Sequence, residues 1–257
     1  MRRREFIRLA GSVSVFVPFG LIAAKAGVTG EVRVLASTAI KTALEALAPQ
    51  FENAAGQKLL VTYGASGRLK PEIENGRAFD LAILSASVAD ALIKDGKLVA
   101  ATRLDIARSG AGVAVRKGSP KRDVSTIESL RRVLLEAKSV GYSETGATGQ
   151  FLLAMFARLG IADDMKPKLK LSQPGKTSLQ ALADGEIDLN IPQISEALVA
   201  PGVDLLGPLP PALQVYTVLP AAVATSAANA HGAKALLDFL RTPAAVSVLK
   251  AKGLEPG

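Results

Sequence analysis

After the first 30 residues, hydrophobic and polar positions fall into two alternating kinds of segment. Short β-branched or aliphatic runs, typical of buried strands, alternate with longer segments whose apolar residues recur at helical spacing. Ile40, Leu44, Leu47 and Phe51, for example, share one helical face. This alternation predicts an α/β fold with helices layered on mostly parallel sheets.

The pattern places the individual elements as follows. The predicted strands are 32–35, 59–63, 81–84, 112–115, 140–142, 168–171, 188–191, and a last strand over 215–219 and 222–224. The predicted helices run from 40 to about 56, over 69–73, 88–93, 127–137, 151–159, around 179–182, and over 233–240 and 244–250. Pro49 is expected to kink or shorten the first helix. Ser125 and Glu128 have the spacing of a capping box for helix 127–137.

These elements form two sets of strands and helices, which meet near residues 108–116 and again near 212–222. We therefore expect two lobes linked by two crossing strands, with the last helices returning to the first lobe. The predicted division is residues 27–110 with 218–257 for the first lobe and 111–217 for the second. A cleft between such lobes is the usual place for a small ligand, and its closure uses the crossing strands as hinges.

The first 26 residues have the pattern of an export signal. Four arginines precede an apolar run over 9–24, which ends in a small-residue cleavage pattern, Ala24-Lys25-Ala26. The run is shorter than the ~20 strongly apolar residues of a spanning helix. Arg3 and Arg4, followed by Phe6, resemble a twin-arginine signal, which exports folded proteins, while ordinary secretion stays open. We expect a periplasmic protein whose signal peptide, residues 1–26, is cleaved.

Composition excludes several classes of function. The 257-residue chain is 49% hydrophobic, enough for a sizeable core, but it has no cysteine and one histidine, His231. Thiolate nucleophiles and cysteine-based metal sites are excluded, and Ser-His-Asp chemistry is disfavoured. Loss of the signal peptide lowers the net charge from +8 to +4, because five cations and one anion leave, and aromatics are only 4%. We therefore expect no nucleic-acid partner, no cofactor and no metal, and we expect that the protein is not an enzyme.

Four junctions between a strand and the next helix are rich in serine, threonine and glycine. Ligands of open α/β sheets bind beyond the carboxyl ends of strands, where helix N-termini present unpaired N–H donors. Each junction alone fits simple helix capping, but four in equivalent places favour a cage for a small oxyanion. Lys176 and Arg68 lie beside two of them, although a surface role is the favoured reading for both. The junctions are 36–39, 64–67, 145–149 and 175–178.

The junctions and their neighbours resemble those of the periplasmic molybdate-binding proteins of ABC transporters. The similar segments are Ala36-Ser37-Thr38-Ala39, 63–69, 79–86 and 145–149, and the resemblance extends over nearly the whole mature chain. It implies the two-lobed type II periplasmic binding protein fold and a monomer whose partner is the membrane permease of an ABC transporter. In that family, serine hydroxyls, backbone amides and a tyrosine hydroxyl hold molybdate or tungstate.

By this resemblance, Ser66 falls on the second serine of the family site and Thr148 on a residue that gives a backbone amide. Ala39 stands where the first serine is expected, with Ser37 or Thr38 able to substitute after a small loop shift. Gln193 stands where the tyrosine is expected, and Gly175 or Lys176 where a further amide is expected. The candidate ligand-binding residues are Ser37, Thr38, Ala39, Ser66, Gly67, Thr148, Gly149, Lys176 and Gln193.

Because of these departures, the ligand stays open between a molybdate-like oxyanion and another small organic or inorganic anion. The role stays open between delivery to a transporter and sensing. An enzyme derived from the fold is the disfavoured alternative.

Overall fold

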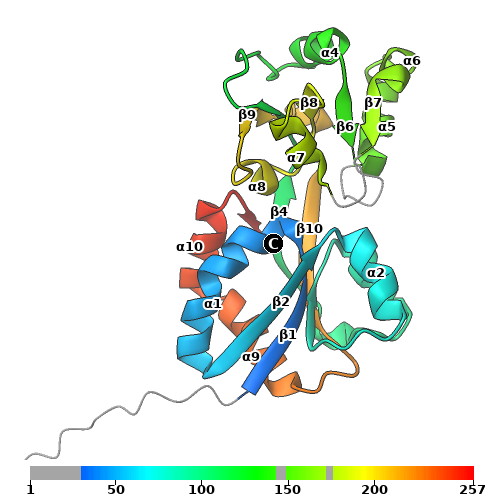
Figure 1. The fold of residues 1–257 in the computed structure, drawn as a ribbon. Helices are drawn as coiled ribbons and strands as arrows, with labels where there is room; N and C mark the ends of the chain where they lie inside the picture. Colours follow the sequence, from blue (N-terminus) through cyan, green and yellow to red (C-terminus); the bar gives the residue numbers. More distant parts are fainter. Residues whose placement is uncertain (1–29, 143–148, 172–175) are drawn as a thin grey trace, which may run out of the picture.

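The computed structural model describes residues 30–142, 149–171 and 176–257, which form two α/β lobes, each built on one sheet (Figure 1). The two-lobed α/β architecture expected from the sequence is confirmed. The predicted signal peptide, residues 1–26, lies outside the described residues. Within them, no helix is long and apolar enough to cross a membrane.

The sheet of the first lobe has six strands in the order β11-β4-β10-β3-β1-β2. Its strands are β1 (Gly30–Ser37), β2 (Gln57–Gly64), β3 (Leu81–Ile83), β4 (Leu104–Gly110), β10 (Tyr216–Val223) and β11 (Glu255–Pro256). β1 runs parallel to β2 and β3, whereas β10 runs antiparallel to β3 and β4, and β11 antiparallel to β4.

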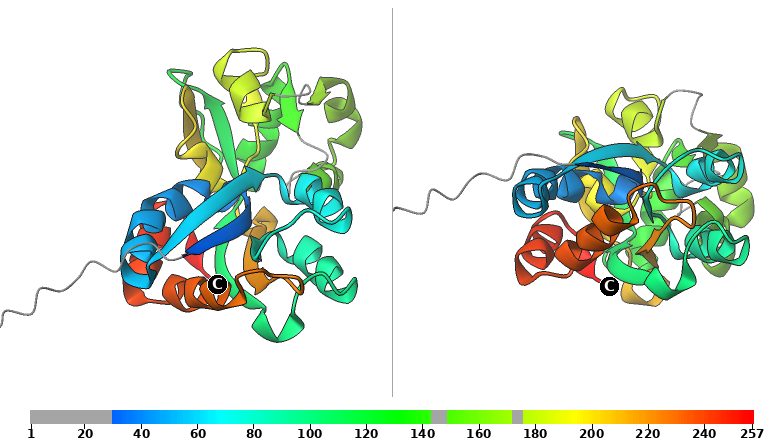
Figure 2. Two further views of the ribbon diagram at one scale, coloured as in Figure 1. Left: turned by 60° about the horizontal axis from the view of Figure 1, so that its bottom comes forward. Right: turned by 90° about the horizontal axis from the view of Figure 1, so that it is seen from below.

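Helices cover both faces of this sheet, as Figure 2 shows. They are α1 (Lys41–Ala55), α2 (Ser66–Glu74), α3 (Ala86–Lys94), α9 (Ala230–Leu240) and α10 (Pro243–Ala251), with 3-10 turns at Thr38–Ile40 (η1) and Ala100–Thr102 (η2). Alternate residues of β1 serve the two faces: Val34 packs in the core beneath α1, α9 and α10, and Leu35 in the core beneath α2 and α3. α1 continues through Pro49 and ends at Gly56 in the left-handed conformation, so Pro49 does not shorten it.

The second lobe has a five-stranded sheet in the order β7-β6-β8-β5-β9. Its strands are β5 (Gly112–Arg116), β6 (Val140–Tyr142), β7 (Leu169–Leu171), β8 (Leu189–Asn190) and β9 (Val203–Pro208). Its helices are α4 (Ile127–Glu136), α5 (Gly149–Arg158), α6 (Ala162–Met165), α7 (Ser178–Ala183) and α8 (Ile194–Ala197), with 3-10 turns η3 (Lys166–Lys168) and η4 (Pro211–Leu213).

Two details of the fold differ from the sequence-based expectations: the cap of α4, and the strand directions in both sheets. α4 is capped by a box made of Thr126 and Ser129, not by Ser125 and Glu128. Each sheet is mixed rather than mostly parallel: β6 runs parallel to β7 and β8, but β5 runs antiparallel to β8 and β9. The antiparallel pairs involve the strands next to the crossings, β4 and β10 in the first lobe and β5 and β9 in the second.

The chain crosses between the lobes twice, and the crossings lie side by side (Figure 1). β4 ends at Gly110 and β5 begins at Gly112, while the second crossing leads from β9 to β10. The Gln214 side chain joins them: its Nε2 donates to the Ala111 carbonyl at 3.0 Å, and its Oε1 accepts from the Ala111 amide at 2.9 Å. Neither β4, β9 nor β11 was expected from the sequence. The division of the chain at residues 27–110 with 218–257 and 111–217 stays a prediction.

Candidate functional site

In the first lobe, the carboxyl ends of β1 and β2 bring two buried serines to one edge of the sheet. Ser37 is the last residue of β1 and pairs in register with Gly64, two residues before Ser66. Ser37 Oγ accepts a hydrogen bond from the Ala39 amide at 3.3 Å and thereby caps η1. Ser66 opens α2, and its Oγ accepts from the Ser85 amide at 2.9 Å. Since each Oγ is an acceptor in these bonds, each hydroxyl hydrogen is left to donate to a further group.

In the second lobe, β6, β7 and β8 run parallel, so their carboxyl ends also share one edge. Gly149, buried, opens α5 after β6, and Thr177 caps α7 after β7 by accepting from the Gln180 amide at 3.2 Å. Thr148 lies outside the described residues. Gly149, a predicted cage residue, therefore lies at the carboxyl edge of this sheet. Gln193, which follows β8 and precedes α8, lies at the same edge.

A hydrogen bond between the lobes shows that these two edges face each other. Thr38, in η1 of the first lobe, donates from Oγ1 to Oε1 of Glu196, in α8 of the second lobe, at 2.5 Å. Ser109 and Ser195 add a second link, with their Oγ atoms 3.0 Å apart. Because η1 follows the carboxyl end of β1 and α8 follows that of β8, the two carboxyl edges lie on the adjoining sides of the lobes.

Glu196 is a carboxyl group without a countercharge. Among the described residues it forms no ion pair, and its carboxyl group interacts with the Thr38 hydroxyl and the backbone amide of Gln193. Burial raises the pKa of the Glu196 carboxyl above its usual value, and these two hydrogen bonds oppose the shift only in part. Glu196 was not among the residues expected from the sequence, because its partner lies 158 positions away.

Two amide side chains at the carboxyl end of β8 are buried without a partner. Asn190, the last residue of β8, is 2% exposed, and its Nδ2 has no hydrogen-bond acceptor. Gln193, which precedes α8, is 4% exposed, and its Oε1 has no donor. Gln193 was predicted as a site residue, but Asn190 was missed. Its signal in the sequence is a polar residue between the apolar Leu189 and Ile191.

The two cations beside the junctions are occupied by surface acids. Lys176 Nζ lies 2.5 Å from Asp184 Oδ2 and 2.7 Å from Glu186 Oε1, which raises the pKa of its ammonium group. Arg68 pairs with Glu72 at 2.9 Å and donates to the Tyr63 carbonyl at 3.0 Å. The surface reading is thus confirmed for Arg68, and Lys176 has no free charge to offer a ligand. His231, in the first turn of α9, is exposed.

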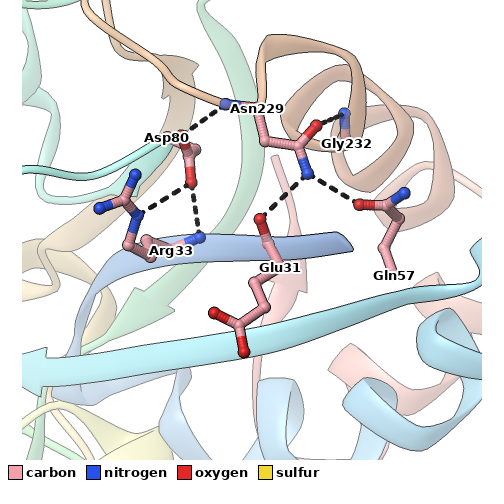
Figure 3. A network of polar contacts seen from close by, with 6 residues as sticks. All are labelled: Glu31, Arg33, Gln57, Asp80, Asn229 and Gly232. Carbon is pink, nitrogen blue, oxygen red and sulfur yellow. Dashed lines mark hydrogen bonds and ion pairs between the residues drawn. The ribbon is translucent and has the colours of Figure 1, made fainter. Parts of the chain in front are cut away.

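A polar network lies at the opposite, amino-terminal end of β1 and is structural (Figure 3). The fully buried Asp80 accepts from the amides of Arg33 at 2.8 Å and Asn229 at 2.9 Å. Asn229 Nδ2 in turn donates to the Glu31 carbonyl and to Gln57 Oε1. A surface depression of about 430 Å³ adjoins this network. Within the described residues, no group of His, Cys, Asp or Glu could hold a metal ion.

Two α/β lobes that meet at the carboxyl edges of their parallel strands, with paired crossings between them, define the class of two-lobed periplasmic binding proteins. The chain belongs to the family of bacterial extracellular solute-binding proteins, whose sequence model matches residues 32–255. The expected resemblance to the molybdate-binding type is confirmed by the relatives described next.

Among curated relatives, aconitate isomerase of a Pseudomonas species is 28% identical over 87% of both chains. The molybdate-binding protein ModA of Escherichia coli K12 is 27% identical over 87% of this chain and 88% of that one. Among solved structures, the periplasmic molybdate-binding protein of Azotobacter vinelandii has a TM-score of 0.74 at 21% identity, covering 88% of this chain and 99% of that one. The sulfate-binding protein SubI of Mycobacterium tuberculosis H37Rv has a TM-score of 0.72 at 19% identity, covering 88% and 87%.

The aconitate isomerase relative overturns one expectation. The absence of cysteine and the single histidine favoured a protein that is not an enzyme, yet a relative that aligns over 87% of both chains has the name of an enzyme, aconitate isomerase. Proton transfer can be performed by carboxyl groups, so the lack of Cys and His does not exclude it. The inference from composition was therefore wrong.

Proposed function

We propose that the chain binds a small polyanion between its two lobes, at the carboxyl edges of β1, β2, β6 and β8. Support comes from the hydroxyls of Ser37 and Ser66 on one side and the start of α5 at Gly149 on the other. Helix starts and hydroxyls provide hydrogen-bond donors without fixed positive charge, which suits an anion that must also be released. The family of solute-binding proteins supports the same reading.

Within this class we propose a di- or tricarboxylic acid rather than molybdate or tungstate. The single observation that carries this choice is the hydrogen bond from Thr38 to Glu196. A threonine hydroxyl has one hydrogen, and here it is given to Glu196, so Thr38 does not replace the serine that Ala39 lacks. The first loop then keeps Ser37 alone as the substitute for that serine, next to a residue that is engaged by a carboxyl group. The relative named aconitate isomerase favours carboxylates independently.

The proposal includes the cellular setting. We propose that residues 1–26 direct export, that the mature protein acts in the periplasm as a monomer, and that it delivers its ligand to the membrane permease of an ABC transporter. The family of extracellular solute-binding proteins supports the location and a transport partner. A sensing role would use the same site with a different membrane partner.

A second candidate function is isomerisation of the bound carboxylic acid. Its support is the relative named aconitate isomerase together with Glu196, an unpaired carboxyl group with a raised pKa where the lobes meet. A carboxyl group whose pKa is raised by burial is a stronger base than an exposed carboxylate, and it can return the proton that it accepts. In this reading the site that captures the anion also moves a proton on it.

Calorimetric titration tests the first proposal, with citrate, trans-aconitate, molybdate, tungstate and sulfate as ligands. One-site binding of a carboxylate that is tighter than binding of either metal oxyanion supports it, and the reverse order contradicts it. Proton NMR of cis-aconitate incubated with the protein in D2O tests the second. Appearance of the trans isomer, abolished by Glu196→Gln, supports isomerisation; an unchanged spectrum over many protein equivalents rejects it for this substrate.

A further inference from the structure

The unpartnered amides of Asn190 and Gln193 need an explanation. Among the described residues, Asn190 Nδ2 and Gln193 Oε1 are buried side-chain atoms that find no hydrogen-bond partner in the protein. Buried polar groups in native structures are nearly always paired, because an unpaired one loses its hydration without compensation. Two such atoms within four residues, at the carboxyl end of β8, indicate a partner that the described residues do not supply.

Strand register places Asn190 beneath the start of α7. Asn190 pairs in register with Ala114 of β5 and Gly141 of β6, so all three share one face of the sheet. On this face Ala114 packs with Leu182 of α7. A Cβ added at Gly141 would lie 3.6 Å from Ser178 Cβ, the first residue of α7. Asn190 is therefore the polar member of the face that α7 covers.

Gln193 lies on the other face, toward α5. It forms an isolated antiparallel bridge with Ala111, and bridged residues share a face. Ala111 packs in the core that contains Leu152 and Met155 of α5. The two amides thus flank the carboxyl edge of β8 from opposite faces, one on the side of each helix that begins at this edge.

The chemistry of the two orphaned atoms defines what would pair with them. Asn190 Nδ2 is a donor and requires an acceptor, such as a carboxylate oxygen. Gln193 Oε1 is an acceptor and requires an O–H or N–H donor. A fully deprotonated metal oxyanion offers acceptors only and would leave Gln193 Oε1 unpaired, whereas a carboxylic acid that carries a hydroxyl or retains an acidic proton satisfies both.

We propose that Asn190 and Gln193 are specificity-determining residues that select a carboxylic acid bearing an O–H donor. This inference rests on the proposed anion-binding function and deepens it. Neither amide is charged, so the pair discriminates by matching donors with acceptors rather than by attraction, and it rejects ligands that lack the donor.

The test measures two quantities in variants that lack these amides: the melting temperature without ligand, which should not fall, and the affinity for the ligand, which should fall. Gln193→Met and Asn190→Leu keep the side-chain volume but remove the orphaned atoms. If the amides serve the ligand, the unliganded variants melt at the same temperature as the wild type or higher, since no internal hydrogen bond is lost. Affinity for the preferred acid falls by about tenfold or more, because a ligand group loses its partner.

A matched control is Gln57→Met. Gln57 Oε1 accepts a hydrogen bond from Asn229 Nδ2 at 2.7 Å, and Gln57 lies in the other lobe, at the amino-terminal end of β2 (Figure 3). The same chemical change there is expected to lower the melting temperature and leave affinity unchanged. If Gln193→Met and Asn190→Leu behave like this control, the amides are structural and the inference is wrong.

The ligand experiment compares citrate with tricarballylate, which has the same three carboxyl groups but no hydroxyl, and with molybdate, each by calorimetry at about pH 7 and about pH 5. Citrate binding tighter at both pH values identifies a hydroxyl as the donor. Tricarballylate reaching the affinity of citrate only at the lower pH identifies an acidic proton. Tightest binding by molybdate overturns the inference. Wild-type protein that binds none of these anions overturns the proposed function with it, whereas normal binding by both variants overturns the inference alone.

Discussion

Asp80 is the residue whose replacement the structure predicts most strongly to destabilise the first lobe. Its carboxylate is fully buried, accepts hydrogen bonds from the amides of Arg33 and Asn229, and has the Arg33 guanidinium at 3.5 Å (Figure 3). Asp80→Ala removes the acceptor of two partly buried N–H groups, those of Arg33 and Asn229, at the point where β1, β3 and the approach to α9 meet. Loss of one partner of such a buried network costs about 3–5 kcal/mol.

For a chain of this size, 1 kcal/mol corresponds to roughly 2–4 °C in melting temperature, so the expected fall is roughly 6–20 °C. Urea unfolding followed by circular dichroism measures the free energy directly. The control is Asp90→Ala, since Asp90 is 57% exposed and pairs with Arg103 on the surface. Surface pairs of this kind contribute about 1 kcal/mol or less. An Asp80→Ala protein that loses no more stability than the control refutes the reasoning.

The pH dependence of the same residue has a definite sign. Burial alone would raise the pKa of the Asp80 carboxyl, but the amides of Arg33 and Asn229 and the Arg33 charge outweigh it and lower the pKa below 3.8. The stabilisation is therefore fully present above the ordinary aspartate pKa and is lost as the pH falls through the lowered one. Wild-type stability measured below about pH 4 should converge on that of Asp80→Asn.

Three further predictions follow from the site and the crossings. Ser66→Ala removes a hydroxyl from the proposed ligand cage, and calorimetry should show affinity for the preferred anion reduced by about tenfold. Gln214→Leu removes both side-chain hydrogen bonds to Ala111, whose amide and carbonyl keep their backbone bonds to Val215 and Leu209, so urea unfolding should show a loss of about 1 kcal/mol; unchanged stability would contradict the role given to this amide. Glu196 has a raised pKa, so its ionisation destabilises the fold increasingly as pH rises above 4.5. The melting temperature of Glu196→Gln should therefore rise relative to that of the wild type as the pH increases above 4.5, and a constant difference would contradict the raised pKa.

Much of the fold could be predicted because strand and helix periods differ clearly in this sequence. The missed elements have weaker patterns for physical reasons. β4 mixes buried Ile106 and Ala107 with exposed Asp105 and Arg108, and β9 runs into a proline-rich segment, so neither reads as an apolar run. The cap of α4 was misassigned because Ser125 and Thr126 are each followed, three residues later, by a residue whose side chain can complete a capping box, Glu128 or Ser129. Sequence spacing alone does not distinguish the two pairs.

The candidate site was predictable only where its residues follow a strand directly. Ser37 and Ser66 do so, and the structure places both at the carboxyl edge. Glu196 was not predictable because its hydrogen-bond partner, Thr38, lies in the other lobe. Asn190 was not predictable because its position at the site depends on the register of β8 against β6. Such contacts depend on how the lobes and strands are assembled, which local sequence patterns do not encode.

The most direct test of the central claim, that the lobes enclose a small carboxylic acid, is one calorimetric competition experiment. The wild-type protein is titrated with citrate and with trans-aconitate, each in the absence and in the presence of excess molybdate. The account predicts one-site binding of at least one of these acids, with an affinity that molybdate barely reduces. Tight binding of molybdate that abolishes binding of both acids would contradict the account and would identify the site as one for metal oxyanions.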